Sequence, residues 1–297
     1  MKSTAYLETR KDKNLNAIMY FLVSIFILLC AYPVYFVIVA SFSNASVVNS
    51  GELLLWPKGF HIDGYKFVFT DQRILTGYTN TIFYTVGGTF LGLICSLMSG
   101  YSLSRDDLPG RGILMGLLVF TMYFSGGLIP TYLIVKSLNL TNTRTICILM
   151  GSISVYNIIL IRTFFSENIP KELQEAAFID GCGNFHFFLK FALPLSKAII
   201  AVIALYLAVG YWNSYYTALI YITDNDKKPL QIFIREMLMT SESTSDFADA
   251  ELASQYKQMV QVVKYAVIVV ATVPIMCIYP FLQRYFVQGV MIGSIKG

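Results

Sequence analysis

The chain has 297 residues, of which 56% are hydrophobic and only 13% are charged, and its mean hydropathy is +0.60. A soluble domain carries about 25% charged residues, so a surface that faces water on every side is excluded. The net charge of +4 is small and gives no indication of a nucleic-acid partner. The composition therefore predicts an integral membrane protein whose surroundings are lipid.

The charged residues are segregated and leave six long uncharged stretches. Each can hold a helix of the roughly 17–25 residues that cross a bilayer core. The stretches lie between Lys13 and Glu52, Arg73 and Arg105, Arg111 and Lys136, Arg144 and Arg162, Lys197 and Asp224, and Lys264 and Arg284. The fourth stretch is the shortest. It can cross the bilayer if the side chains of Arg144 and Arg162, which flank it, extend toward the lipid head groups. We therefore predict an all-α polytopic protein in which residues 1–297 form a single transmembrane domain of six helices.

Basic residues before the first stretch set the predicted orientation. Lys2, Arg10, Lys11 and Lys13 favour a cytoplasmic N-terminus. Six spans then return the C-terminus to the cytoplasm. The expected cytoplasmic parts are residues 1–13, 162–197 and 284–297, and residues 224–263 are expected to form a long external loop. The apolar part of the first stretch, residues 17–40, is longer than the roughly 7–15 residues of a signal-peptide core, so no cleavage is expected.

The predicted spans contain no Asp, Glu, Lys, Arg or His. Proton- and ion-coupled carriers usually need ionisable groups within the membrane, so the driving energy is expected to come from elsewhere. The chain has no Gly-x-x-x-x-Gly-Lys-[Ser/Thr] loop, so ATP is expected to bind to a partner.

The sequence also offers no predicted metal site. His61 and His186 are predicted to lie on opposite sides of the membrane, and the five cysteines are scattered without metal-ligand spacing. We expect no catalytic residue, metal or cofactor in this chain, and no enzyme activity of its own.

The cytoplasmic segment at 162–197 begins with a helix signal. Pro170 suits the first turn of a helix, because its missing N–H would be unpaired there anyway. Glu172 and Glu175 follow near the positive end of that helix, and Ala176 and Ala177 add small side chains. These residues predict a short helix with an acidic and a small face.

A turn and a second helix are expected next. Asp180-Gly181 is a turn signal, Asn184 is placed to cap a second short helix, and Pro194 is placed to end it. The pattern predicts a helix–turn–helix on the membrane surface. By residue types alone, it fits either a surface that enters a neighbour's groove or an amphipathic return to the bilayer.

The heptapeptide Glu175-Ala176-Ala177-Phe178-Ile179-Asp180-Gly181, with Leu193-Pro194 further on, resembles the EAA loop of ABC importer membrane subunits. In that family the loop forms the coupling helix, which docks into a cleft on the ATPase subunit. The resemblance implies that Glu175, Ala176, Ala177, Asp180, Gly181 and Pro194 couple this chain to an ATPase. Two departures are mild: Cys182 replaces the usual Ala, and Phe191 stands where Ile is common.

Other segments narrow the resemblance to carbohydrate importers. The C-terminal sequence from Gln283 to Gly297 is similar to the tail of the maltose-type permease that ends shortly after its last span. Tyr101-Ser102-Leu103-Ser104-Arg105 and Trp212-Asn213 also fit that group. The run Phe124-Ser125-Gly126-Gly127-Leu128-Ile129-Pro130-Thr131-Tyr132 resembles a Gram-positive branch that handles complex polysaccharides or aldouronates. Together these resemblances cover residues 17–297.

The resemblance implies a type I importer fold in a bacterial plasma membrane. It implies a heterodimer with a second homologous permease, a dimer of ATP-binding cassette ATPases that binds ATP and Mg, and an extracellular solute-binding protein. It also implies that the C-terminal tail contacts the ATPase through Gln288, Gly289, Gly293, Lys296 and Gly297. The sugar itself is not specified by these motifs.

Two aromatic segments are candidates for the substrate path. Tyr123 and Phe124 lie in the third predicted span, and Trp212, Asn213 and Tyr216 lie in the fifth. Trp212 and Tyr216 are four residues apart, so they are predicted to share one face of a continuous helix. Sugars stack on aromatic rings and bond to Asn or Tyr, but aromatics at such depths also serve helix packing. Both interpretations stay open.

Two alternative functions also stay open. One is an ABC permease for another solute, such as a peptide or an anion. An anion carrier is expected to show basic groups or helix N-termini at its site, and no predicted span has a basic residue. The other is a membrane protein with no ATPase partner.

Overall fold

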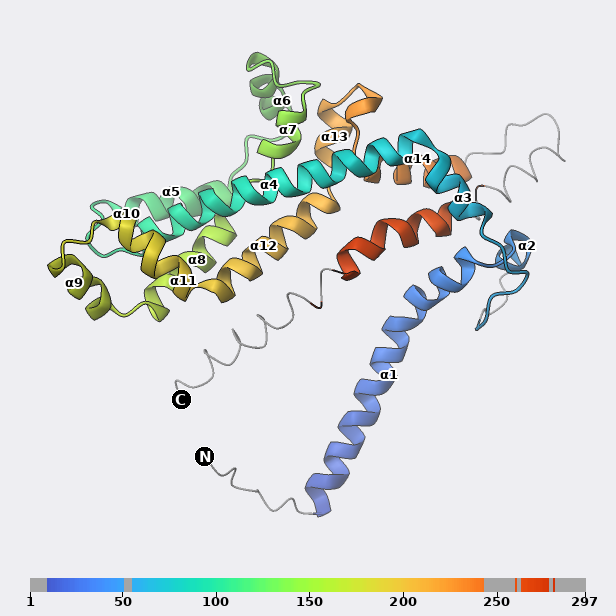
Figure 1. Ribbon diagram of the computed structural model, residues 1–297, viewed down its shortest axis with the longest axis horizontal. Coiled ribbons are helices and arrows are strands. Elements are labelled where there is room, and N and C mark those ends of the chain that lie inside the picture. The colour runs from blue at the N-terminus through green and yellow to red at the C-terminus, as the bar shows by residue number, and fades with distance from the viewer. Residues whose placement is uncertain (1–9, 51–54, 243–259, 261–262, 278–279, 281–297) are drawn as a thin grey trace. The chain divides into compact units, whose positions relative to one another are not determined.

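The computed structural model describes all residues except 1–9, 51–54, 243–259, 261–262, 278–279 and 281–297 (Figure 1). The described part of the chain is helical and contains no strand, which confirms the predicted all-α class. It forms two compact units, one of residues 1–70 with 237–271 and one of residues 71–236 with 272–297. Each unit is described by itself below.

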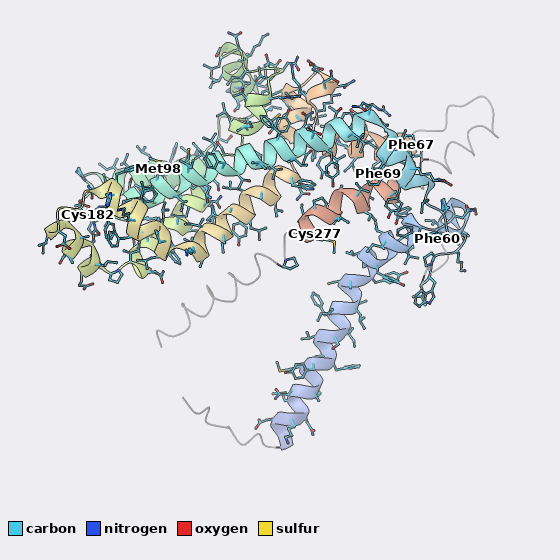
Figure 2. The ribbon with its side chains drawn as sticks, in the orientation of Figure 1. Phe60, Phe67, Phe69, Met98, Cys182 and Cys277 are labelled. Atoms are coloured by element: carbon cyan, nitrogen blue, oxygen red, sulfur yellow. The ribbon has the colours of Figure 1, made fainter. Side chains whose placement is uncertain are left out.

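The first unit contains one long apolar helix and two short ones. Helix α1 (Arg10–Ser41) has large hydrophobic side chains exposed around its whole circumference, as a lipid-facing helix requires (Figure 2). Its end packs with α2 (Ala45–Asn49), where Val39 and Ala40 are buried against Val47 and Val48. Helix α3 (Asp63–Thr70) follows. The described residues also contain a shorter apolar helix, Val263–Cys277.

The second unit is arranged around α4 (Gln72–Ser104), a helix of 33 residues. Helices α8 (Val155–Asn168) and α12 (Lys197–Trp212) pack along it (Figure 1). The other elements are α5 (Arg111–Tyr123), α6 (Leu128–Ser137), α7 (Arg144–Leu149), α9 (Lys171–Ile179), α10 (Asn184–Phe187), a π-helical turn (Phe188–Ala192), α11 (Leu193–Leu195), α13 (Tyr216–Tyr221), a 3₁₀ turn (Asn225–Lys227) and α14 (Leu230–Glu242).

Two helices of the described part are long and apolar enough to cross a membrane by themselves, Asp12–Ser41 and Gln72–Ser104. Two bent pairs pass the same test together: Arg111–Tyr123 with Leu128–Ser137, bent by 112°, and Asn184–Leu195 with Lys197–Trp212, bent by 84°. Counting each pair as one span gives up to four. The predicted total of six therefore stays a prediction.

Three predicted spans differ from continuous helices. The third breaks at residues 124–127, between α5 and α6, and the fourth breaks at residues 150–154, between α7 and α8. In the fifth, α12 ends at Trp212 and α13 begins at Tyr216. The predicted external loop at 224–263 contains α14. Hydropathy did not indicate these breaks, because apolar side chains favour lipid whether or not the backbone is helical.

Candidate functional site

The segment predicted to couple to an ATPase is a helix–turn–helix, as expected. Helix α9 ends in a Schellman motif, in which Gly181 adopts a left-handed φ of +80°. The N–H of Gly181 donates to the carbonyl of Phe178 at 3.0 Å, and the N–H of Cys182 donates to the carbonyl of Ala177 at 2.9 Å. Cys182, at the tight turn itself, is labelled in Figure 2. The turn therefore needs a residue that tolerates positive φ, which explains the Asp180-Gly181 pair.

The second helix differs from its prediction in two details. Its N-cap is Gly183 rather than Asn184, because the N–H of Phe187 bonds to the Gly183 carbonyl at 2.9 Å. Pro194 does not end the segment: it lies in α11, which continues the π-helical turn without a break in the helical backbone. The sharp bend comes at Ser196 instead, between α11 and α12.

One side of the helix–turn–helix is exposed and partly apolar. Ile179 is 87% exposed and Phe185 is 65% exposed. Glu175, Ala176 and Asp180 are exposed with them. We call these five residues the coupling surface. Large apolar side chains next to carboxylates, at the end of a packed segment, are typical of a surface that a partner covers.

The opposite side of the helix–turn–helix is packed into the second unit. Ala177, Phe187 and Ala192 are buried in one cluster with residues of the three long helices. That cluster contains Leu97 and Tyr101 of α4, Ile161 and Phe165 of α8, and Ile203 and Leu207 of α12. The coupling surface is therefore carried by a segment that packs closely against α4, α8 and α12.

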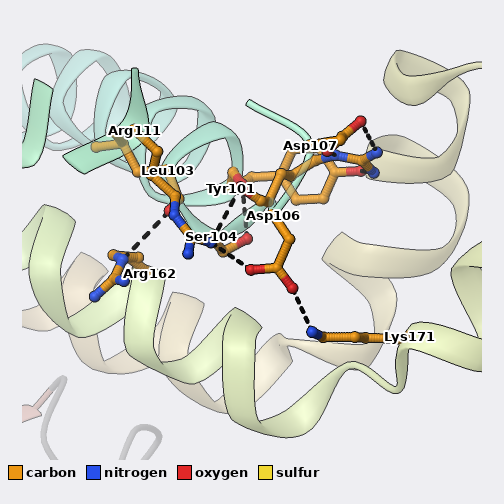
Figure 3. A network of polar contacts seen from close by, with 9 residues as sticks. Tyr101, Leu103, Ser104, Asp106, Asp107, Arg111, Arg162 and Lys171 are labelled. Carbon is orange, nitrogen blue, oxygen red and sulfur yellow. Dashed lines mark hydrogen bonds and ion pairs between the residues drawn. The ribbon is translucent and has the colours of Figure 1, made fainter. Parts of the chain in front are cut away.

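A polar network ties the same segment to the loop after α4 (Figure 3). Lys171, the first residue of α9, forms an ion pair with Asp106, which also accepts from Arg111 at 2.6 Å. Arg105 bonds to Asp107 at 2.6 Å, and its guanidinium lies 5.1 Å from the centre of the Phe178 ring. The hydrogen bond from Lys171 holds the pKa of Asp106 below its usual value. These residues line a cleft of about 640 Å³.

Sequence reasoning missed Arg105 and Asp106 as parts of this segment. They are 65 positions and more before Lys171, and nothing in their local pattern distinguishes them from charges that flank a span. Arg105 is the last residue of the motif Tyr101–Arg105 that resembles carbohydrate importers, and this was the one signal that pointed to it; Asp106 lies outside that motif.

A second cavity, of about 410 Å³, lies where two predicted spans break. We call it the break cavity. Its lining residues are Met150, Gly151, Ser154, Asn157, Tyr206, Leu207, Gly210, Tyr211, Ser214 and Thr217. Two of them, Tyr211 and Leu207, lie directly against Gly88 and Gly92 at the middle of α4. The cavity is therefore level with the centre of α4.

The structure does not gather the residues predicted for the substrate path. Tyr123 and Phe124 are exposed at the end of α5, and Phe124 stacks on Phe120. Trp212 is buried and meets Tyr78 edge to face, whereas Tyr216 is exposed. The prediction that Trp212 and Tyr216 share one helix face is wrong, because α12 ends between them.

Asn213, the remaining residue of that set, caps the end of α12. Its side-chain amide donates to the Val209 carbonyl at 2.9 Å. The five predicted residues line neither of the two cavities described above. Their contact with a sugar stays a prediction.

The predicted tail contacts Gln288, Gly289, Gly293, Lys296 and Gly297 lie outside the described residues. The described residues hold no group of three or more His, Cys, Asp and Glu side chains that could bind a metal ion.

Comparison with known proteins gives consistent matches over the whole chain. The family model "binding-protein-dependent transport system inner membrane component" matches residues 3–292. The polygalacturonan/rhamnogalacturonan transport system permease protein YtcP of Bacillus subtilis is 41% identical over 97% of this chain and 100% of that protein. Protein LplC of the same organism is 42% identical over 89% of both chains.

A solved structure shows the same fold. It is the crystal structure of a bacterial ABC transporter involved in the import of the acidic polysaccharide alginate. The match has a TM-score of 0.84 and 30% identity, and it covers 95% of this chain and 100% of the other. The predicted type I importer permease fold is thereby confirmed.

A helical membrane bundle with an exposed helix–turn–helix, matched along its length to importer permeases, is a translocation subunit rather than an enzyme. The chain belongs to the family of inner membrane components of binding-protein-dependent transport systems. It therefore works in a membrane, as one component of a larger transport system.

Proposed function

We propose that this chain is a permease subunit of an ATP-driven importer of oligosaccharides that derive from acidic polysaccharides. Two independent likenesses support this substrate class. The 41% identical relative is named for polygalacturonan and rhamnogalacturonan, and the matching structure for alginate. A relative named for arabinooligosaccharides, from Halalkalibacterium halodurans, is only 28% identical over 91% of this chain.

The observation that carries the proposed mechanism is the coupling surface. Its exposed Ile179 and Phe185 project from a segment whose other side is buried among α4, α8 and α12. An ATPase cleft that covers these side chains would gain apolar burial, which is the main driving force of protein association. Closure of the ATPase dimer would then move the three helices, and this movement would open the substrate path to one side of the membrane at a time.

The proposed complex contains a second homologous permease, two ATPase subunits that bind ATP and Mg²⁺, and an extracellular solute-binding protein. Both termini of this chain lie in the cytoplasm, and residues 1–297 act as one transmembrane domain. Gln288, Gly289, Gly293, Lys296 and Gly297 add a second contact with the ATPase. The external segment 224–263 helps to dock the binding protein, because a connection of this length usually has a binding role.

The test uses the complete importer in proteoliposomes, with uptake of labelled trigalacturonate and ATPase activity as the two readouts. Glu175→Lys and Gly181→Asp are expected to abolish uptake while the permease pair stays assembled. Glu167→Lys makes the same charge change on an exposed residue at the end of α8, outside the coupling surface, and is expected to retain uptake. Normal uptake by both coupling variants would contradict the coupling role, and failure of the unmodified importer to carry any acidic glycan would contradict the substrate class.

A further inference from the structure

The break cavity contains several polar side chains in a mostly apolar lining, and it lies level with the centre of α4. Its walls come from the interruption between α7 and α8 and from the interruption between α12 and α13. Irregular backbone at such a depth is tolerated where it lines a protein cavity rather than lipid. Its volume of about 410 Å³ falls within the range of about 300–1,000 Å³ that is usual for small-molecule sites.

Asn157 is the most informative side chain of the cavity. It is only 5% exposed, and its carboxamide makes no hydrogen bond with any residue that the structure describes. Neither polar atom of this carboxamide is among the fully enclosed side-chain atoms without a partner, so the amide is open to the cavity and can bond to a group inside it. Since the carboxamide lines the cavity, a polar group inside the cavity is the partner that the structure provides for.

The start of α8 indicates separately that the cavity favours an anionic group. Ser154 caps this helix of 14 residues and also lines the cavity. Ser154 and Asn157 are the residues of this first turn that line the cavity. The N–H groups of Val155 and Tyr156, which have no acceptor within the described residues, lie beside them and outside the lining. Unpaired N–H groups and the helix dipole make the N-terminus of a helix favourable for an anion. Since no charged side chain lines the cavity, this preference is not cancelled by a carboxylate.

Hydroxyl groups complete the lining. The side chains of Tyr206, Ser214 and Thr217 border the cavity and make no hydrogen bond in the described part of the chain. Tyr211 is different, because its hydroxyl already donates to the Ile148 carbonyl at 2.5 Å, so that its ring serves as a wall. One end of the cavity thus favours an anion, and the hydroxyl groups elsewhere in its lining can donate hydrogen bonds to, or accept them from, the hydroxyls of a sugar.

We propose that the break cavity binds one uronate residue of the transported glycan, with its carboxylate at the start of α8 and on the amide of Asn157. The hydroxyls of Tyr206, Ser214 and Thr217 then contact the sugar ring. This inference rests on the proposed function, and it assigns a substrate contact to this subunit. It also explains how an acidic sugar can be carried through spans without Lys or Arg: neutral donors bind the carboxylate at discontinuous helices.

The experiment measures uptake of trigalacturonate and of its methyl ester by the complete importer in proteoliposomes. Asn157→Leu is expected to reduce trigalacturonate uptake by about 10- to 100-fold, because it removes a hydrogen bond to a charged group. Its effect on the uncharged ester is expected to be several-fold smaller. Thr217→Val, which preserves side-chain shape, is expected to lower uptake of both glycans. Asn168→Leu is the matched control, because it makes the same change near the other end of α8 and outside the cavity.

The outcomes separate this inference from the proposed function. If the unmodified importer carries trigalacturonate and both cavity variants do so at the same rate, the site is overturned while the proposed function stands. Equal losses for the acid and the ester in Asn157→Leu overturn the carboxylate contact. Dissociation of the two permeases in Asn157→Leu, with normal uptake in Thr217→Val, shows that the partner subunit covers the cavity and also overturns the site. If the unmodified importer carries no glycan, the proposed function fails, and the inference fails with it.

Discussion

The ring of Tyr211 lies against the backbone of Gly88, at the middle of α4. A β-carbon at position 88 would lie 2.2 Å from the ring carbon Cζ of Tyr211, which is far inside van der Waals contact. The Tyr211 hydroxyl continues to the carbonyl of Ile148 in α7. The absence of a side chain at Gly88 therefore allows α4, α7 and α12 to meet at one point beside the break cavity.

Gly88→Ala is expected to destabilise the permease by about 1–3 kcal/mol, because the added methyl group displaces the Tyr211 ring and overpacks the site. The measurement is the thermal unfolding midpoint of the purified protein in detergent. Gly116→Ala is the control: Gly116 lies in α5 and has open space around it, so an alanine there is neutral or slightly stabilising. Equal midpoints for the two variants would show that the Tyr211 contact does not constrain packing.

Asp106→Asn is expected to loosen the start of α9, because it removes the ion pair with Lys171. Amide hydrogen exchange in the first turn of α9 should accelerate by about two- to five-fold, the range expected for an exposed ion pair. Asp63→Asn breaks a comparable exposed pair with Lys66 in the first unit and is expected to leave α9 unchanged. Unchanged exchange in the Asp106 variant would reduce the pair to a surface contact without structural effect.

The same ion pair has a defined pH dependence. Lys171, and then Arg111, lower the pKa of the Asp106 carboxyl from its ordinary value of 3.8. A lowered carboxyl pKa contributes stability that is complete above the ordinary value and is lost as pH falls through the folded-state pKa. The difference in exchange between the wild type and Asp106→Asn should therefore stay constant from about pH 5 to pH 8. A difference that disappears within this range would contradict the assignment.

Asn80 fixes the segment after α13 to α4. Its side-chain amide donates to the carbonyls of Asp226 at 2.8 Å and of Lys228 at 3.0 Å, and the side chain is buried. Asn80→Leu leaves both carbonyls without this donor and is expected to cost about 1–3 kcal/mol of stability, measured by thermal unfolding. Thr79→Val, on the neighbouring exposed residue, is the control. If Asn80→Leu also weakens stimulation of the ATPase by the binding protein, the segment has a role in docking.

Trp212 and Tyr216 are expected to respond differently to replacement by Leu. Trp212 is buried and lies edge to face with Tyr78 at 5.7 Å between ring centres, so Trp212→Leu should destabilise by about 1–3 kcal/mol. Tyr216 is 56% exposed, so Tyr216→Leu should change stability by no more than about 0.5 kcal/mol. Uptake lost in a stable Tyr216→Leu importer would favour substrate contact, whereas equal destabilisation of both variants would contradict this division of roles.

The class of the protein and the helix–turn–helix at 171–195 could both be predicted from the sequence. The low number of charged residues and their segregation exclude a soluble fold. Both can be seen in the sequence, because they depend only on which side chains are present and in what order. The turn at Asp180 and Gly181 was also predictable, since a Schellman motif depends on the conformational freedom of one residue and on hydrogen bonds within six positions. Local chemistry and motif resemblance were sufficient for both.

The positions of the helix breaks, and the cavity that they enclose, depend on tertiary packing. Hydropathy measures the transfer of side chains into lipid, so residues 145–161 and the run from Trp212 to Tyr216 indicate uninterrupted spans. The packing of α8 and α12 along α4 brings the two breaks to one cavity, and Asn157 becomes informative only once its neighbours are known. The pair of Asp106 with Lys171 is likewise formed by residues 65 positions apart. Contacts of this kind depend on the path of the whole chain, which no local pattern contains.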